Sequence, residues 1–156
     1  MTKIRKATIN DLETIQKLNE KLCLKEYKKF DNTINPTFPL LEQGKSYFLE
    51  RITKNDECVF VALEKGKIIG YLAGGIIEPE SYRILKKIAE AENMFVLEEY
   101  RGRGIGSRLL EKFFKWCKSK KINRIKVVIS SDNSQSINFH KKNGFSDYNV
   151  VLEKKI

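Results

Sequence analysis

Three glycines at alternate positions, set between two arginines and a serine, are the residues of this chain that point most directly to chemistry. The segment reads Arg101-Gly102-Arg103-Gly104-Ile105-Gly106-Ser107, and the flanking patterns predict a strand before it and a helix after it. Glycines let a backbone turn tightly and approach a ligand closely. The first amides of a helix have no partner inside the helix, so they attract an anion. The segment therefore predicts a phosphate or diphosphate site, with a flexible turn that binds no ligand as the alternative.

Two better-known phosphate loops do not match this segment. A dinucleotide fingerprint has the spacing G-x-G-x-x-G, and Ser107 stands where its third glycine would be. A nucleotide P-loop ends in Gly-Lys-Ser/Thr, which the segment lacks. The residues alone leave the ligand open.

A second block of polar and aromatic residues follows, from Asn133 to Phe145, and reads NSQSINFHKKNGF. It predicts a short helix over about 134–142 that ends at Asn143-Gly144, a common helix C-terminal signal. Asn133 stands at the expected start of this helix, where asparagine is a good N-cap. His140 is the only histidine of the chain, and the ordinary pKa of a histidine lies near neutral pH.

Together these blocks resemble the GNAT superfamily of N-acetyltransferases. Arg101-x-x-Gly104-x-Gly106 is similar to the family's acetyl-CoA signature, R/Q-x-x-G-x-G/A, and the second block is similar to N-x-x-A-x-x-F-Y-x-K-x-G-F. Residues 91–96 resemble the family's fourth strand. The motifs that carry the resemblance lie within residues 91–145. The resemblance implies transfer of an acetyl group from acetyl-CoA to a primary amine. The amine would attack the thioester directly, and the CoA thiolate would leave. Neither the acceptor nor the preference for acetyl over longer acyl groups follows from the sequence.

The resemblance also implies a cofactor site and no metal. In family members the fourth and fifth strands splay apart, and the pantetheine arm of CoA pairs with a bulged fourth strand in the gap. One amide of that strand would face the thioester oxygen, and Asn133 would touch the cofactor or only cap its helix. The residues expected to bind the cofactor are Met94, Phe95, Val96, Arg101, Gly102, Arg103, Gly104, Ile105, Gly106, Ser107, Asn133, Ser136, Phe139 and Lys142.

The transfer needs two proton movements. Family members usually protonate the departing thiolate with a tyrosine where this chain has His140, so we expect His140 to be the acid, with a packing role as the alternative. The glutamate that some members carry on the fifth strand corresponds to Val128 here. Glu92 or Glu90 on the fourth strand is the substitute base that other members suggest, and we name Glu92 as the candidate. Deprotonation through water is the alternative.

Composition limits the other classes of function. The chain has 156 residues and a net charge of +10, with basic residues spread along its whole length. Surface lysines or a polyanionic cofactor explain this charge better than nucleic acid does, because no aromatic-basic RNA motif appears. Cys23, Cys58 and Cys117 lie far apart, so they predict free, buried or half-buried thiols and exclude a zinc site of paired ligands. No run is long enough for a membrane span and no signal peptide is present, so we expect a cytoplasmic protein.

Hydrophobic periodicity predicts an α/β layer architecture with the order β-α-α-β-β-(α)-β-α-β-α-β. The resemblance implies a GNAT-like acyl-CoA N-acyltransferase fold, a single domain over residues 1–156 whose mostly antiparallel sheet has splayed fourth and fifth strands. The last strand would offer an edge to a second copy in a homodimer. Gly74 and Gly75 predict a bulge or a close backbone approach.

Two other functions compete with acetyl transfer. One is a CoA-binding regulatory module without catalysis, and the other is a basic nucleic-acid-binding domain. The expected strands cover residues 3–8, 58–64, 67–77, 91–97, 124–130 and 145–155. The first expected helix begins at Asn10, and the other four cover about residues 42–53, 81–88, 104–120 and 134–142.

Overall fold

A mixed five-stranded sheet forms the centre of the computed structural model, which describes residues 1–156. The strands β1 (Lys3–Lys6), β2 (Glu57–Glu64), β3 (Lys67–Ile77) and β4 (Ile88–Val96) pair in antiparallel fashion in that order, and β5 (Ile125–Lys126) joins β4 in parallel. The predicted α/β fold with a mostly antiparallel sheet is confirmed.

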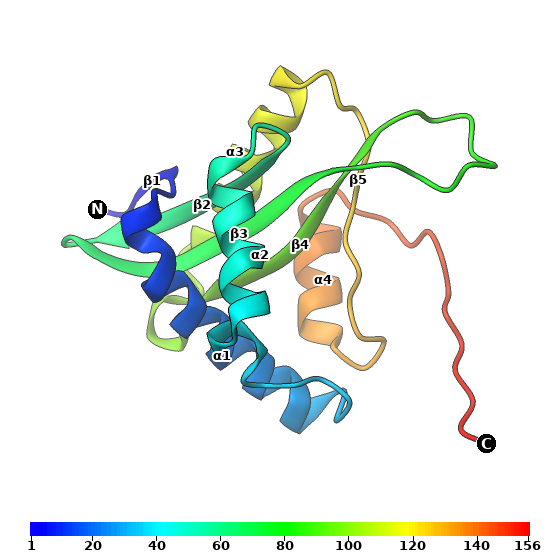
Figure 1. Ribbon diagram of the computed structural model, residues 1–156, viewed down its shortest axis with the longest axis horizontal. Coiled ribbons are helices and arrows are strands. Elements are labelled where there is room, and N and C mark those ends of the chain that lie inside the picture. The colour runs from blue at the N-terminus through cyan, green and yellow to red at the C-terminus, as the bar shows by residue number, and fades with distance from the viewer.

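Helices cover both faces of this sheet (Figure 1). On one face, α1 (Leu12–Lys29) and α2 (Glu42–Thr53) pack on the side chains of β2 that include Val59 and Val61. On the other face, α3 (Ile105–Ser119) packs on the alternate side chains of β2, such as Phe60, while α4 (Ser134–Lys142) adds Phe139 to the same core. This alternation along one strand gives the sheet two separate apolar cores. None of the helices has the length and hydropathy needed to cross a membrane.

Strands β4 and β5 separate soon after they meet. Only Ala89 with Ile125 and Glu90 with Lys126 are paired, so the edge of β4 that faces β5 is unpaired from Ala91 onward. The predicted splay between the fourth and fifth strands is therefore confirmed, and it leaves backbone groups of β4 available to another extended chain.

A bulge in β4 lies next to Gly74. Ala73 of β3 pairs with Asn93 and Gly74 pairs with Ala91, so Glu92 has no partner on β3. A Cβ atom on Gly74 would lie 2.4 Å from the Glu90 carbonyl oxygen and 2.8 Å from the Phe113 ring. Only glycine fits there, and the close backbone approach predicted at this position is confirmed.

Three expected elements differ from the structure. Residues 81–87 form no helix, and Ile88 already begins β4. The reason is exposure: Tyr82 and Ile84 are 78% and 101% exposed, so a short helix there would bury no apolar face to stabilise it.

The strand expected over residues 124–130 is limited to the two residues of β5, and Val128 is 71% exposed rather than doubly covered. The strand expected over residues 145–155 does not form. Val150, Val151 and Leu152 are 85%, 88% and 90% exposed, and the tail runs away from the sheet (Figure 1). With no strand on its far side and β4 turning away, residues 127–130 have no ladder to join. The edge of the sheet is thus β5 and not a strand over residues 145–155. The homodimer that was expected to form through such a strand stays a prediction.

A cap formed by Thr8 and Asp11 precedes α1. The Asp11 carboxylate accepts a hydrogen bond from the Thr8 amide at 2.7 Å. The same carboxylate accepts from the two terminal nitrogens of Arg5 at 2.6 and 3.0 Å. The Arg5 guanidinium, with help from Thr8, lowers the pKa of Asp11 to about 2.

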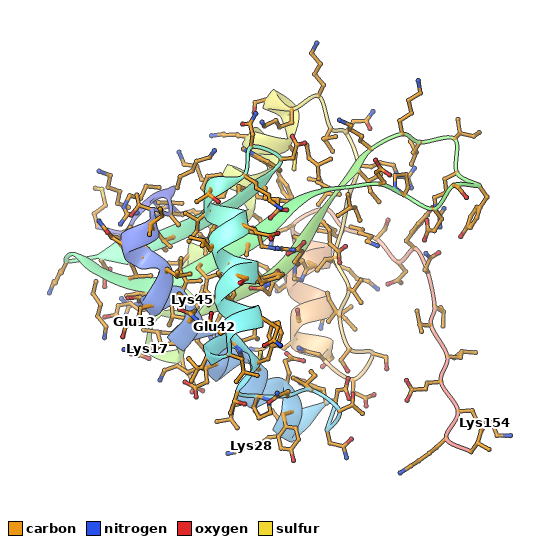
Figure 2. The ribbon with its side chains drawn as sticks, in the orientation of Figure 1. Glu13, Lys17, Lys28, Glu42, Lys45 and Lys154 are labelled. Atoms are coloured by element: carbon orange, nitrogen blue, oxygen red, sulfur yellow. The ribbon has the colours of Figure 1, made fainter.

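This ion pair predicts an acid-sensitive contribution to stability. Because the pKa of Asp11 is depressed in the folded state from 3.8, its contribution is complete above about pH 4 and is lost as the pH falls toward about 2. Asp11→Asn should lower the free energy of unfolding by about 1–2 kcal/mol at neutral pH, measured by urea denaturation. The exposed pair of Glu13 and Lys17 (Figure 2) supplies the control, Glu13→Gln, which should have little effect. A deficit in Asp11→Asn that persists unchanged to about pH 2 would contradict the assignment.

The three cysteines agree with the sequence. Cys58 and Cys117 are buried, Cys23 is half-buried, and all three are free thiols. Burial raises the pKa of the Cys117 thiol to about 12, so this thiol is inert at neutral pH.

Candidate functional site

The glycine-rich loop leads from β4 into α3 through two left-handed residues. Gly102 has φ +74° and Gly104 has φ +72°, and Gly104 is the N-cap of α3. L-residues other than glycine adopt this conformation only at a cost in strain. The two glycines therefore set the direction in which the first turn of α3 presents its backbone.

The backbone amides that follow Arg101 in this loop are free. None of the amides of residues 102–107 donates a hydrogen bond to another group of the protein. The Arg101 amide before them donates to the Glu98 carbonyl, and the Arg108 amide after them donates to the Gly104 carbonyl. Consecutive unpaired amides at a helix N-terminus, with the positive end of the helix dipole behind them, favour an anion. The local geometry thus suits the diphosphate that the sequence predicts.

The two arginines of the loop differ in how far they are fixed. The Nε of Arg101 donates to the Val96 carbonyl at 2.8 Å, and its guanidinium lies 5.1 Å from the centre of the Phe95 ring. Arg101 therefore ties the loop to the end of β4. Arg103 is exposed, donates to the Glu99 carbonyl at 3.2 Å, and has the Glu64 carboxylate 3.8 Å away.

Three parts of the predicted site meet at Gly106. A Cβ atom on this residue would lie 3.0 Å from the Phe139 ring and 3.8 Å from the Met94 methyl group. The first turn of α3, the unpaired edge of β4 and the middle of α4 are therefore adjacent. Ile105 is buried in the core beneath them, and Ser107 is half-buried. Lys142, by contrast, is exposed at the C-terminal end of α4 and forms no ion pair.

Asn133 is the N-cap of α4. Its side-chain oxygen accepts from the Ser136 amide at 3.1 Å, which confirms the capping interpretation. Its amide nitrogen lies 3.4 Å from the Glu26 carboxylate of α1, and burial raises the pKa of that carboxyl. Sequence reasoning did not find Glu26, because one glutamate in a lysine-rich helix carries no motif.

His140 is buried, with 6% of its surface exposed. Its Nδ1 lies 2.8 Å from the Ser136 carbonyl oxygen. Because a carbonyl only accepts, Nδ1 carries the proton in this contact and Nε2 is the nitrogen left for chemistry. Burial lowers the pKa of His140 below its usual 6.5, so the neutral ring predominates at neutral pH. The rings of Phe139 and Phe145 pack edge-on against it at 5.1 and 5.3 Å.

Glu92, at the bulge of β4, is held by α2. Arg51 donates to one carboxylate oxygen at 2.8 Å, and both the Nε of Arg51 and the hydroxyl of Tyr47 donate to the other. Arg51 also lies 3.4 Å from the Glu57 carboxylate. Burial, together with the nearby negative charge of Glu92, raises the pKa of Tyr47 above its ordinary range, so this hydroxyl stays protonated as a donor.

The network extends from the bulge to α1. Asn93 donates to the Tyr47 hydroxyl at 2.8 Å, and Asn19 of α1 donates to the fully buried Tyr71 hydroxyl at 2.6 Å. Asn19 and Asn93 are themselves 3.4 Å apart. Helices α1 and α2 thus fix the bulge through side chains that the sequence showed only as parts of amphipathic helices.

The other carboxylate considered as a base is also paired. The carboxylate of Glu90 lies 3.6 Å from the Lys126 ammonium of β5. Val128, the residue that the resemblance matched to a fifth-strand glutamate, is exposed. Both carboxylates of β4 are therefore paired with cations, Glu92 with Arg51 and Glu90 with Lys126.

Comparison with known proteins agrees with this geometry. The model of the acetyltransferase (GNAT) family matches residues 25–145, which include the glycine loop and α4. The chain belongs to this family. A relative in Methanocaldococcus jannaschii, described as an uncharacterized N-acetyltransferase, is 27% identical over 95% of this chain, which spans only 62% of that relative's length. An N-alpha-acetyltransferase of Sulfurisphaera tokodaii is 26% identical and is matched over 96% of this chain and 83% of its own.

A solved acetyltransferase structure has the same fold. The predicted acetyltransferase of Clostridium acetobutylicum, determined with acetyl-CoA, superposes with a TM-score of 0.79 at 24% identity and covers 99% of this chain and 96% of its own. GNAT members use acetyl-CoA, and the free amides and split sheet of this chain are the features that such a cosubstrate requires.

Proposed function

We propose that this GNAT protein is an N-acetyltransferase that transfers the acetyl group of acetyl-CoA to a primary amine by direct attack, within a single domain over residues 1–156. One observation carries the proposal. The free amides of residues 102–107 lie beside the edge of β4 that β5 leaves unpaired. An anion site and an open strand edge at one place suit a ligand that has both a diphosphate and an extended amide-containing arm.

In this proposal each part of the site has a separate task. The amides of the loop bind the diphosphate, while Arg101 and Arg103 add charge. The backbone of Met94, Phe95 and Val96 pairs with the amide groups of the pantetheine arm, and one of their amides stabilises the charge that develops on the thioester oxygen. Bound acetyl-CoA supplies the activated acetyl group. Ser107, Ser136, Asn133, Phe139 and Lys142 are proposed as further contacts to it.

His140 is proposed as the group that gives a proton to the departing thiolate. Because Nδ1 is engaged with the Ser136 carbonyl, Nε2 is the nitrogen that donates, and it can do so only in the imidazolium form. The lowered pKa of His140 makes this form scarce at neutral pH but a stronger acid when it is present.

Glu92 is proposed as the base that accepts the proton of the ammonium acceptor. Arg51 and Tyr47 already donate hydrogen bonds to both of its carboxylate oxygens, so its contribution should be modest. Glu92→Gln should lower kcat/KM for an amine acceptor by about fivefold near pH 7, and by less near pH 9, where more of the amine is already neutral. Glu90→Gln, on the same strand, is the control and should leave the rate unchanged. Equal rates for Glu92→Gln and wild type at both pH values would favour deprotonation through water.

A thiol-release assay tests the proposed function. The protein is mixed with acetyl-CoA and a panel of small amines, polyamines, lysine peptides and peptides with free N-termini. The printed name of the Sulfurisphaera relative supports including the last class. We expect acceptor-dependent release of free CoA. If calorimetry shows that CoA binds but no acceptor is turned over, the result would instead support a CoA-binding regulatory module. Salt-dependent binding of nucleic acid that acetyl-CoA does not displace would support a nucleic-acid-binding domain.

A further inference from the structure

A basic groove lies between the second half of α1, the end of β4 and the start of α4. Its volume is ≈ 380 Å³, and its charged lining consists of Lys21, Lys25, Lys29, Glu98, Glu99 and Arg101. Four cations thus face two carboxylates. Arg101 belongs both to this groove and to the glycine loop, so the groove is continuous with the predicted diphosphate site. A second basic pocket, between β1 and α3, shares no residue with the loop or with β4.

The three lysines form one row without partners. They are spaced four residues apart, which places them on one side of α1. None of them forms an ion pair or a side-chain hydrogen bond, whereas Lys17 of the same helix pairs with Glu13 at 2.7 Å. Lys25 is half-buried. Burial, and after it the charge of Arg101, lowers its pKa. Because four cations face two carboxylates in this groove and the three lysines form no ion pair, the groove has a net positive charge that favours an anion.

We propose that this groove is a phosphate-monoester subsite that binds the 3′-phosphate of the CoA nucleotide. The inference rests on the proposed function, because it needs CoA at the loop. The diphosphate can be bound by backbone amides, which cover one site at the mouth of α3. The 3′-phosphate is a separate, doubly charged group on the same ligand, and mobile lysine side chains suit such a group. The row on α1 is then what makes this protein distinguish CoA from 3′-dephospho-CoA.

The test compares the calorimetric Kd of CoA with that of 3′-dephospho-CoA. Wild type should bind CoA about tenfold more tightly, as expected for charge-assisted contacts to one phosphate. The triple variant Lys21→Ala/Lys25→Ala/Lys29→Ala should reduce this ratio to about one, mainly by weakening CoA. Alanine preserves α1 because it has the best helix propensity, and circular dichroism verifies the fold.

A charge-matched control separates a local subsite from general attraction. Lys28, Lys45 and Lys154 are exposed and lie on α1, on α2 and in the C-terminal tail (Figure 2). Changing these three lysines to alanine removes the same charge outside the groove and should keep the wild-type ratio. The proposed subsite is overturned if wild type binds CoA and 3′-dephospho-CoA equally, or if both triple variants change the ratio of the two Kd values alike. It is also overturned if the triple variant in the groove alters only the KM of the acceptor. Wild type that binds neither ligand would contradict the proposed function as well.

Discussion

Gly104→Val is expected to raise the Kd of CoA by about a hundredfold or more, because it disturbs the amides on which the diphosphate depends. A β-branched residue is strained at the left-handed φ of this position. The backbone would therefore rotate away, and the amides that follow Gly104 would no longer converge on one point. Calorimetric titration with CoA measures the effect.

The chain offers a matched control for this substitution. Gly66, in the turn between β2 and β3, has φ +77°, and at both glycines an added Cβ would meet nothing within 4 Å. Gly66→Val therefore imposes similar backbone strain, and both variants should lose similar stability, of about 1–2 kcal/mol. Only Gly104→Val should lose CoA affinity. Equal affinities in the two variants would show that the loop does not hold the diphosphate.

His140→Phe is expected to lower kcat about tenfold or more near pH 6, with a smaller loss as the pH rises. The donor is the imidazolium, which predominates only below the pKa of His140, and burial places that pKa below 6.5. Wild-type kcat should therefore contain a component that falls as the pH rises through this pKa, and the component should be absent from the variant. Initial rates of thiol release between about pH 5.5 and 8.5, at saturating acceptor, measure both profiles.

A packing role for His140 predicts a different pattern. Phenylalanine keeps an aromatic ring between Phe139 and Phe145, so the fold and the KM for acetyl-CoA should change little. A loss in kcat below about threefold at every pH would contradict proton donation. A loss that is the same at all pH values would point to packing against the reacting groups instead.

The parts of the site that are local in sequence could be predicted, because the backbone itself creates them. Alternate glycines before an apolar helical stripe indicate both the left-handed turns and the free amides of α3. Likewise, the Asn133 cap and the Gly144 stop define α4. The splay of β4 and β5 was available only through the resemblance to the family, since no residue pattern specifies where two strands separate.

The parts that depend on distant contacts could not be predicted. Tyr47 and Arg51 read as ordinary residues of an amphipathic helix, and their contact with Glu92 exists only because α2 crosses β4. The lysine row on α1 forms no sequence motif, and its place beside Arg101 depends on how α1 packs against the end of β4. The opposite error occurred at residues 127–130 and 145–155, where strand-like sequences lack neighbours with which to pair.

The most direct test of diphosphate binding at the loop is an NMR titration of ¹⁵N-labelled protein with CoA. The amides of Gly104, Gly106 and Ser107 are expected to move most and to shift downfield, because amides that gain a charged hydrogen bond do so. The amides along β4 from Met94 to Val96 should move with them. Saturation with CoA while these amides stay at their original positions, with the largest shifts elsewhere, would contradict diphosphate binding at the loop.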